Sequence, residues 1–304
     1  MSEKRDLVLT TVQGVDFDYL APFVSSLKRT GFRGRLVVFA SAMKGDAVSQ
    51  LERHGVTVVS FPFISKRLRE FFFWPFWPFW RRLFALNAFP EFKEKLAHVA
   101  LPLFYRRHLI YLQYLRAHRL EYDRVFLTDA RDVFFQADPF SWNPPPGLHL
   151  FLLDSSHTVQ ASQLDVNWTK NQFGRTDASR HLDKIASCAG TTFGDTEEVI
   201  TYLTKMIATS LGAKNLRRVT GGDDQGVHNY LIYENLLPVV TLHPNRRSAV
   251  LTTTTMTMSE IPLNAAGLIT SESGEVIPVI HQYDRLPELK QHLLGRLNDT
   301  GLKG

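Results

Sequence analysis

The chain has 304 residues, of which 44% are hydrophobic and 21% charged, with a formal net charge of +5 and one cysteine. This composition is typical of a globular protein and excludes a disordered chain. The lone thiol, Cys188, excludes an intramolecular disulfide and a zinc site built from cysteines. We expect no secretory signal and no membrane-spanning helix, hence a cytoplasmic protein whose basic character favours polyanionic partners.

The N-terminal half alternates apolar strands with helical segments. We predict strands over residues 6–12, 35–40, 56–60 and 124–128, and helices over residues 17–29, 46–54 and 98–118. This order is typical of an α/β fold with a Rossmann-type, mostly parallel central sheet flanked by helices. No Gly-x-Gly-x-x-Gly turn follows the first strand and no P-loop occurs, which disfavours dinucleotide dehydrogenases and P-loop enzymes.

The C-terminal half alternates less regularly. We predict strands over residues 148–153, 239–242 and 276–280, and helices over residues 196–211 and 227–233. No repeat of fixed period occurs, so one domain spanning residues 1–304 is expected.

Two carboxylates, Asp129 and Asp132, follow the predicted strand at residues 124–128. Ligands of open α/β sheets bind outside the carboxyl ends of the strands. If the chain turns at residues 130–131, both carboxylates can bind one divalent cation, which can bridge to a substrate diphosphate. The alternative is structural: Asp129 caps a turn, and Asp132 pairs with Arg131 or Arg124.

The segment at residues 127–140 resembles the Asp-x-Asp region of GT-A-fold glycosyltransferases. Residues 188–194 resemble the donor-side Asn/Ser-Gly segment of the family-8-like members, and residues 222–229 resemble their Asp-Gln element. The resemblance implies a GT-A-like fold and a metal-dependent glycosyltransferase. Such an enzyme transfers a sugar from a nucleotide-diphosphate-sugar donor to a saccharide or lipid-linked acceptor, with Mn²⁺ or Mg²⁺ as cofactor.

The resemblance also divides the chain. Residues 1–140 are expected to form the nucleotide-sugar-binding half, and residues 141–304 the acceptor-side half with a C-terminal metal-ligand segment. Candidate donor-binding residues are Thr10, Thr11, Asp129, Arg131, Gly190 and Gln225. Thr10 and Thr11 lie at the end of the first strand, where an ordinary strand–helix turn explains them equally well.

The motif departs from the family pattern in two places. The family spaces its two metal carboxylates two residues apart, whereas Arg131 is inserted here before Asp132. This leaves open which aspartate binds the metal, and whether Asp129 contacts the ribose while Asp132 alone is a ligand. Cys188 and Ala189 replace the usual Asn-Ser, so a backbone group is the alternative donor contact.

His281 immediately follows the late strand at residues 276–280. Its imidazole can complete the ion site opposite Asp129 and Asp132, and mixed oxygen and imidazole ligands suit manganese better than calcium. The resemblance implies the same role, because related enzymes use a C-terminal histidine as a metal ligand. The alternative is an ordinary core or surface histidine.

Asp223 and Asp224 follow two glycines and precede a predicted helix. Simple helix capping is one interpretation. In a transferase, the same carboxylates contact the donor sugar or accept the acceptor proton. If the reaction inverts the anomeric centre, a base is required, with Asp224 the first candidate and Asp223 the second. A retaining reaction needs no dedicated base.

Residues 61–97 form an aromatic and basic insertion. Ten residues, Phe71 to Trp80, include two prolines and lie between Lys66-Arg67-Arg69 and Arg81-Arg82. Rings between cations suit the headgroup region of an inner membrane surface, so peripheral contact through residues 66–82 is one prediction. Packing of the rings on the core is the second, and stacking on single-stranded nucleic acid is the least favoured; no nucleic-acid partner is expected. A noncatalytic membrane-surface or scaffolding protein of the same fold is therefore the alternative function.

Overall fold

A computed structural model describes residues 5–86, 90–174, 179–212 and 222–298. The core is a seven-stranded sheet in the order β3-β2-β1-β4-β7-β6-β8. The strands are β1 (Asp6–Gln13), β2 (Arg35–Ser41), β3 (Thr57–Ser60), β4 (Arg124–Thr128), β6 (Leu148–Leu152), β7 (Ser187–Asp195) and β8 (Val240–His243). Strands β1 to β4 are mutually parallel, and β7 is antiparallel to its neighbours β4 and β6. The predicted α/β class and mostly parallel sheet are confirmed.

The apolar runs form central strands because both faces of the sheet are covered. In β1, the side chains of Leu7 and Leu9 pack in one core cluster while Val8 packs in another, and all three are fully buried. Such double burial explains why the strand reads as a continuous apolar run rather than an alternating one.

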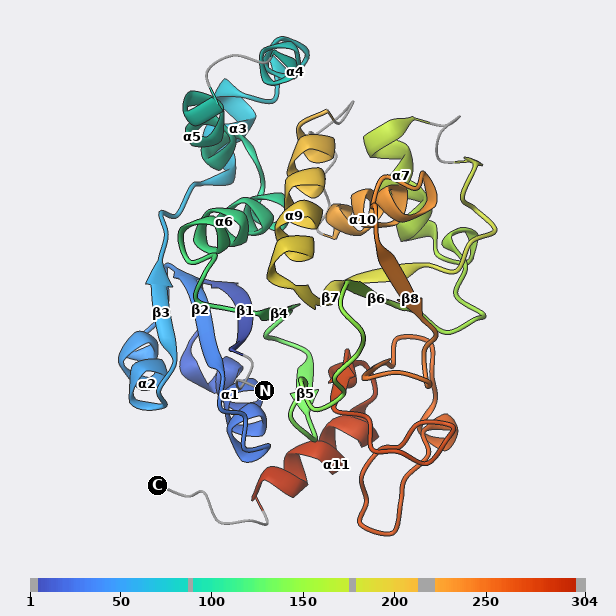
Figure 1. Cartoon of the computed structure of the whole chain (residues 1–304). Helices are drawn as coiled ribbons and strands as arrows, with labels where there is room; N and C mark the ends of the chain where they lie inside the picture. The colour runs from blue at the N-terminus through green and yellow to red at the C-terminus, as the bar shows by residue number, and fades with distance from the viewer. Residues whose placement is uncertain (1–4, 87–89, 175–178, 213–221, 299–304) are drawn as a thin grey trace.

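Helices cover both faces (Figure 1). On one face lie α1 (Phe17–Arg29) and α2 (Ala47–Arg53), and on the other α6 (Leu103–Ala117), α9 (Thr196–Leu211) and α10 (Asp223–Tyr233). The helix α7 (Gln163–Phe173) packs against α10, and α11 (Pro287–Asn298) contacts α1. Asp16 begins α1 as its cap, because its carboxylate accepts a hydrogen bond from the backbone N–H of Tyr19 at 3.1 Å.

A small second sheet, in the order β5-β10-β9, lies beside the main one (Figure 1). It consists of β5 (Val133–Phe135), β9 (Val250–Thr252) and β10 (Val279–His281). The described residues also form three 3₁₀ helices: η1 (Val159–Ala161), η2 (Met258–Glu260) and η3 (Tyr283–Arg285).

Two predictions of local structure were wrong. The single helix expected over residues 98–118 is two helices, α5 (Pro90–Ala100) and α6, because Pro102 has an extended backbone and no N–H for a continuous helix. The segment at 188–194 was not predicted as a strand, yet it forms most of β7. Residues 66–72 and 77–85 of the aromatic insertion form α3 (Lys66–Phe72) and α4 (Trp77–Ala85). None of the described helices is long and apolar enough to cross a bilayer.

Candidate metal centre and its pocket

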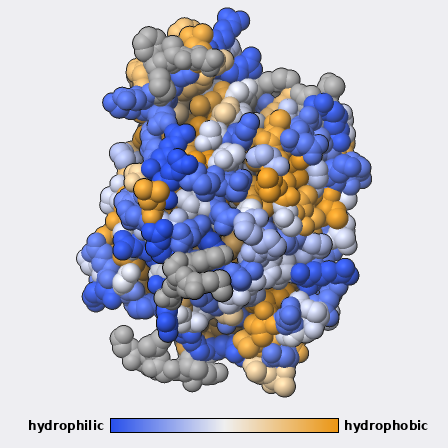
Figure 2. Space-filling model, in the orientation of Figure 1, coloured by the Kyte–Doolittle hydropathy of each residue, from blue (hydrophilic) through white to orange (hydrophobic). Residues whose placement is uncertain are grey.

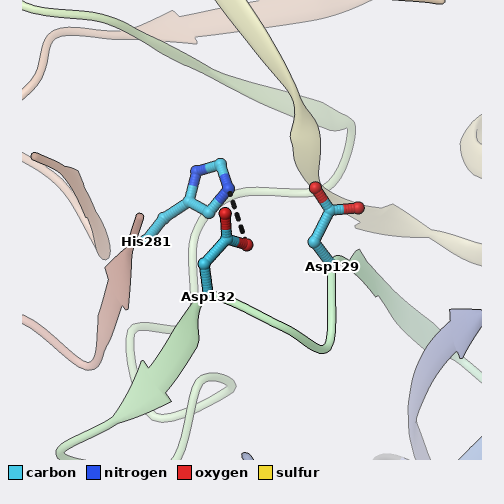
Figure 3. A group of neighbouring side chains, drawn as sticks. All are labelled: Asp129, Asp132 and His281. Carbon is cyan, nitrogen blue, oxygen red and sulfur yellow. Dashed lines mark ion pairs between the residues drawn. The ribbon is translucent and has the colours of Figure 1, made fainter. Parts of the chain in front are cut away.

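A bend of the chain and one strand pairing bring Asp129, Asp132 and His281 together (Figure 3). Asp129 directly follows β4, and the chain then bends so that Asp132 directly precedes β5. Strand β5 pairs with β10 in a register that places His281 opposite Val133. The imidazole therefore lies next to the Asp132 carboxylate although the two residues are far apart in sequence.

The three side chains have the geometry of a metal site. Each offers one ligand atom, and these atoms all lie within 4.8 Å of one another. The Nε2 atom of His281 lies 3.8 Å from Oδ1 of Asp132. Both atoms are buried, and neither has a hydrogen-bond partner among the residues that the structure describes. Because buried polar atoms are rarely left unsatisfied, two facing orphan ligand atoms fit a divalent cation between them.

Surrounding groups orient the ligands. Oγ1 of Thr252 lies 3.3 Å from Nδ1 of His281 and can accept a hydrogen bond from it, which leaves the lone pair of Nε2 for a cation. The backbone N–H of Gln282 donates to the carbonyl oxygen of Asp132 at 2.6 Å. Gln282 has a φ of 60°, an unusual conformation for a residue with a side chain, at the position that follows the histidine.

Gly190 lies against the same site because β7 pairs with β4 and its carbonyl accepts a hydrogen bond from the N–H of Asp129 at 2.9 Å. A Cβ atom at this position would lie 2.7 Å from Oδ2 of Asp129 and 2.8 Å from Nε2 of His281. Only glycine therefore leaves the ligand atoms in this arrangement.

The structural alternative for Asp132, an ion pair with Arg131, is also present, and it leaves one carboxylate oxygen for a metal. The Arg131 guanidinium contacts Oδ2 of Asp132 at 2.5 Å and lies 3.5 Å from Asp284. Oδ1 of Asp132 is the atom that faces His281. Arg124 pairs with Asp6 instead, at 2.7 Å.

A cavity of about 580 Å³ opens beside the three ligands. This volume is in the range of small-ligand sites. It is lined by five of the predicted donor-binding residues: Thr11, Asp129, Arg131, Gly190 and Gln225. Asp132 and Asp224 also line it, together with Trp168 and Arg285. Among the described residues, the cavity thus joins the candidate metal centre to the acidic start of α10.

Three of the predicted site residues are not part of the cavity lining. Thr10 is fully buried, because alternation along β1 turns its side chain away from the face that Thr11 occupies. Asp223 is also fully buried, whereas its neighbour Asp224 reaches the cavity. His281 is fully buried behind the cavity wall, and one nitrogen of its ring faces the carboxylates of the candidate metal centre.

Arg107 connects the metal centre to Asp224. Its guanidinium is bonded to Oδ1 of Asp129 and to Oδ2 of Asp224, the latter at 2.6 Å. Burial raises the pKa of the Asp224 carboxyl above its ordinary value, and the charge of Arg107 opposes that rise. Both carboxylates are thus held in fixed orientations at the cavity wall.

The prediction from sequence missed Arg107. Its signal is the run Arg106-Arg107-His108 inside the mainly apolar and aromatic helix α6, in which Arg106 and His108 are buried. Charged side chains on the buried part of a helix need partners, which indicates a site.

A second missed contact fixes Gln225. Its side-chain amide donates to Oδ1 of Asp165 on α7 at 2.5 Å, and the other carboxylate oxygen of Asp165 lies 3.1 Å from Nε2 of His157. The amide of Gln225 is therefore held at the cavity wall by two elements packed against each other.

No protein-family model matches this chain, and no curated protein matches it either.

Proposed function

We propose that the chain is a metal-dependent glycosyltransferase with a GT-A-like fold, which transfers a sugar from a nucleotide-diphosphate-sugar donor to a saccharide or lipid-linked acceptor. The observation that carries the proposal is the convergence of Asp129, Asp132 and His281 at the end of β4, beside a cavity of about 580 Å³. Two carboxylates and an imidazole are a ligand set suited to Mn²⁺, with Mg²⁺ as the second candidate.

Asp129, Asp132 and His281 would hold the cation. When bound, it supplies positive charge that stabilises the departing nucleoside diphosphate. Asp129 is the more exposed of the two carboxylates, and so it is the ligand nearest to an entering donor. The orphan pair formed by Asp132 and His281 supplies the enclosed part of the site.

Arginines complement the diphosphate. Arg131 and Arg285 line the cavity together with Arg107. Arg107 pairs with Asp129 and Asp224, and Arg131 pairs with Asp132, so these cations offset the acidic groups of the wall that a negatively charged ligand would meet. Thr11 and Gln225 supply polar side chains at the same wall. This combination fits a phosphorylated donor better than a neutral sugar alone.

Asp224 is the group placed to accept a proton from an acceptor hydroxyl in an inverting reaction. It reaches the cavity, and its raised pKa makes its carboxylate a stronger base than an exposed aspartate. Asp223 remains the second candidate, although it is buried outside the lining. In a retaining reaction, Asp224 would instead position the donor sugar.

The proposal is tested by thermal unfolding with a panel of nucleoside diphosphates, with and without MnCl₂, followed by donor hydrolysis measurements. A ligand at one hundred times its dissociation constant adds about 2.7 kcal/mol to the free energy of unfolding. We expect one diphosphate to stabilise the chain in a manganese-dependent manner. Asp132→Asn should remove that effect, whereas the exposed control Asp46→Asn should keep it.

The alternative is a noncatalytic membrane-surface protein of the same fold, and the exposed rings of α3 and α4 are the observation that favours it. It predicts no stabilisation by any diphosphate with manganese and no turnover of any donor. Manganese-dependent stabilisation of the wild-type chain by a diphosphate, or turnover of a donor, would exclude this alternative.

A further inference from the structure

The aromatic insertion exposes four phenylalanine rings within nine residues of sequence. Phe71, Phe72, Phe76 and Phe79, here called the aromatic patch, are 73%, 55%, 60% and 60% exposed. The rings of Phe71 and Phe72 lie 4.9 Å apart. Nε1 of Trp80 donates to the carbonyl of Phe72 at 3.3 Å and so ties α4 to the end of α3. The patch therefore comes from two short helices that this contact holds together.

The patch is supported from below. Phe73, Trp74 and Trp77 come from the same stretch, are only 8%, 7% and 2% exposed, and belong to the main core cluster. The prediction that the insertion packs on the core is thus correct for these three residues. The rings of the aromatic patch are exposed to solvent although buried neighbours flank them in the sequence. Such exposure of apolar surface to water is unfavourable and is typical of a binding surface.

Basic residues flank the patch in the sequence. Between residues 66 and 86 the chain carries Lys66, Arg67, Arg69, Arg81 and Arg82 against the single acid Glu70. Arg69 is buried and Lys66 lies 3.6 Å from Glu70, so Arg67, Arg81 and Arg82 are the cations considered at the surface. Within the described part of the chain, no ion pair joins Arg67, Arg81 or Arg82 to an acidic side chain. Figure 1 shows α3 and α4 at one end of the molecule, away from the central sheet, and Figure 2 shows hydrophobic and hydrophilic residues together at that end.

We propose that the aromatic patch docks on the surface of an anionic phospholipid bilayer. Phenylalanine rings enter the interface between headgroups and acyl chains, while the flanking arginines meet lipid phosphates and carboxylates. The two helices have seven and nine residues, so they lie in the interface and do not cross it. The positive charge of Arg67, Arg81 and Arg82 favours an anionic lipid surface over a second copy of this chain as the partner, because the same charges on two copies would repel each other. This docking does not depend on sugar transfer.

The test is co-sedimentation of the full-length chain with vesicles made of equal parts phosphatidylserine and phosphatidylcholine, or of phosphatidylcholine alone. We expect binding to the anionic vesicles that weakens with added salt, and little binding to the neutral ones. Replacing Phe76 and Phe79 by serine should lower the partition coefficient by about tenfold or more. Arg82→Gln should lower it about fivefold, the equivalent of about 1 kcal/mol per basic residue near an anionic surface.

Two matched controls separate docking from general stickiness. Leu120→Ser removes an apolar side chain that is 85% exposed elsewhere, and Arg33→Gln removes an exposed cation elsewhere. Both should bind vesicles like the wild type, and circular dichroism should show all variants folded. Equal binding to neutral and anionic vesicles, or binding unaffected in Phe76→Ser/Phe79→Ser, would overturn the proposal. So would light scattering that shows a dimer which dissociates in that double variant, or binding of single-stranded RNA in preference to the vesicles.

Discussion

Substituting Gly190 by alanine tests the metal centre without removing a ligand. The added Cβ would lie 2.8 Å from Nε2 of His281, so the two groups must separate by about 0.6 Å to reach ordinary contact. Metal–ligand distances tolerate about 0.2 Å, a third of that displacement. We therefore expect Gly190→Ala to bind Mn²⁺ about 10- to 100-fold more weakly than the wild type, the usual effect of disturbing ligand orientation.

Calorimetric titration with MnCl₂ measures this change, and chemical denaturation without metal measures stability. Overpacking at Gly190 should lower the free energy of unfolding by about 1–3 kcal/mol and leave the chain folded. Gly295→Ala is the matched control, because no atom lies within 4 Å of its added Cβ and it lies inside α11. This control should bind Mn²⁺ normally and gain about 0.5–1 kcal/mol in stability. Wild-type manganese affinity in folded Gly190→Ala would refute the proposed position of the ion.

Three further changes probe the ligands, the buried ion pairs and a buried histidine. Asp132→Asn should weaken Mn²⁺ binding by at least about tenfold in the same titration while Asp46→Asn does not, and equal affinities would show that Asp132 is no ligand. Arg107→Gln leaves the Asp224 carboxylate buried without its partner, so the free energy of unfolding measured by denaturation should fall by about 3–5 kcal/mol. The double variant Arg107→Gln/Asp224→Asn should recover most of this loss. Additive losses in the double variant would contradict the pairing. Burial lowers the pKa of His228 from 6.5 to about 3, so the unfolded chain binds a proton that the folded chain excludes as the pH falls through this range. The contribution of His228 to the free energy of unfolding is complete above pH 6.5 and falls by about 1.4 kcal/mol per pH unit below it. His228→Gln should therefore flatten the pH dependence of stability measured by denaturation. An unchanged slope would exclude His228 as the source of that pH dependence.

The strands buried on both faces carry the clearest sequence signal, although the less buried β3 and β8 were also predicted. Strands β1, β2 and β4 are runs of apolar residues, so their pattern already indicates the central sheet. Strand β7 could not be recognised in the same way. It contains Gly190, Thr191 and Thr192, and it is a strand because pairing with β4 and β6 satisfies its backbone, a tertiary effect that no local pattern encodes.

Site residues could be predicted where they adjoin a strand that the sequence pattern reveals. Asp129 and Asp132 were found because they follow a recognisable strand, and His281 because it ends another. The sequence alone did not establish that they converge, since this depends on β5 pairing with β10. Arg107 was missed because its two partners are Asp129 after β4 and Asp224 on α10, which meet α6 only in the folded chain.

The most direct test of the account is anomalous diffraction at the manganese absorption edge from crystals grown with MnCl₂ and a nucleoside diphosphate. We predict one strong peak about 2.0–2.3 Å from ligand atoms of Asp129, Asp132 and His281, with the diphosphate in the cavity beside it. A peak at other residues, or no peak at these three under saturating manganese, would contradict the assignment of this centre.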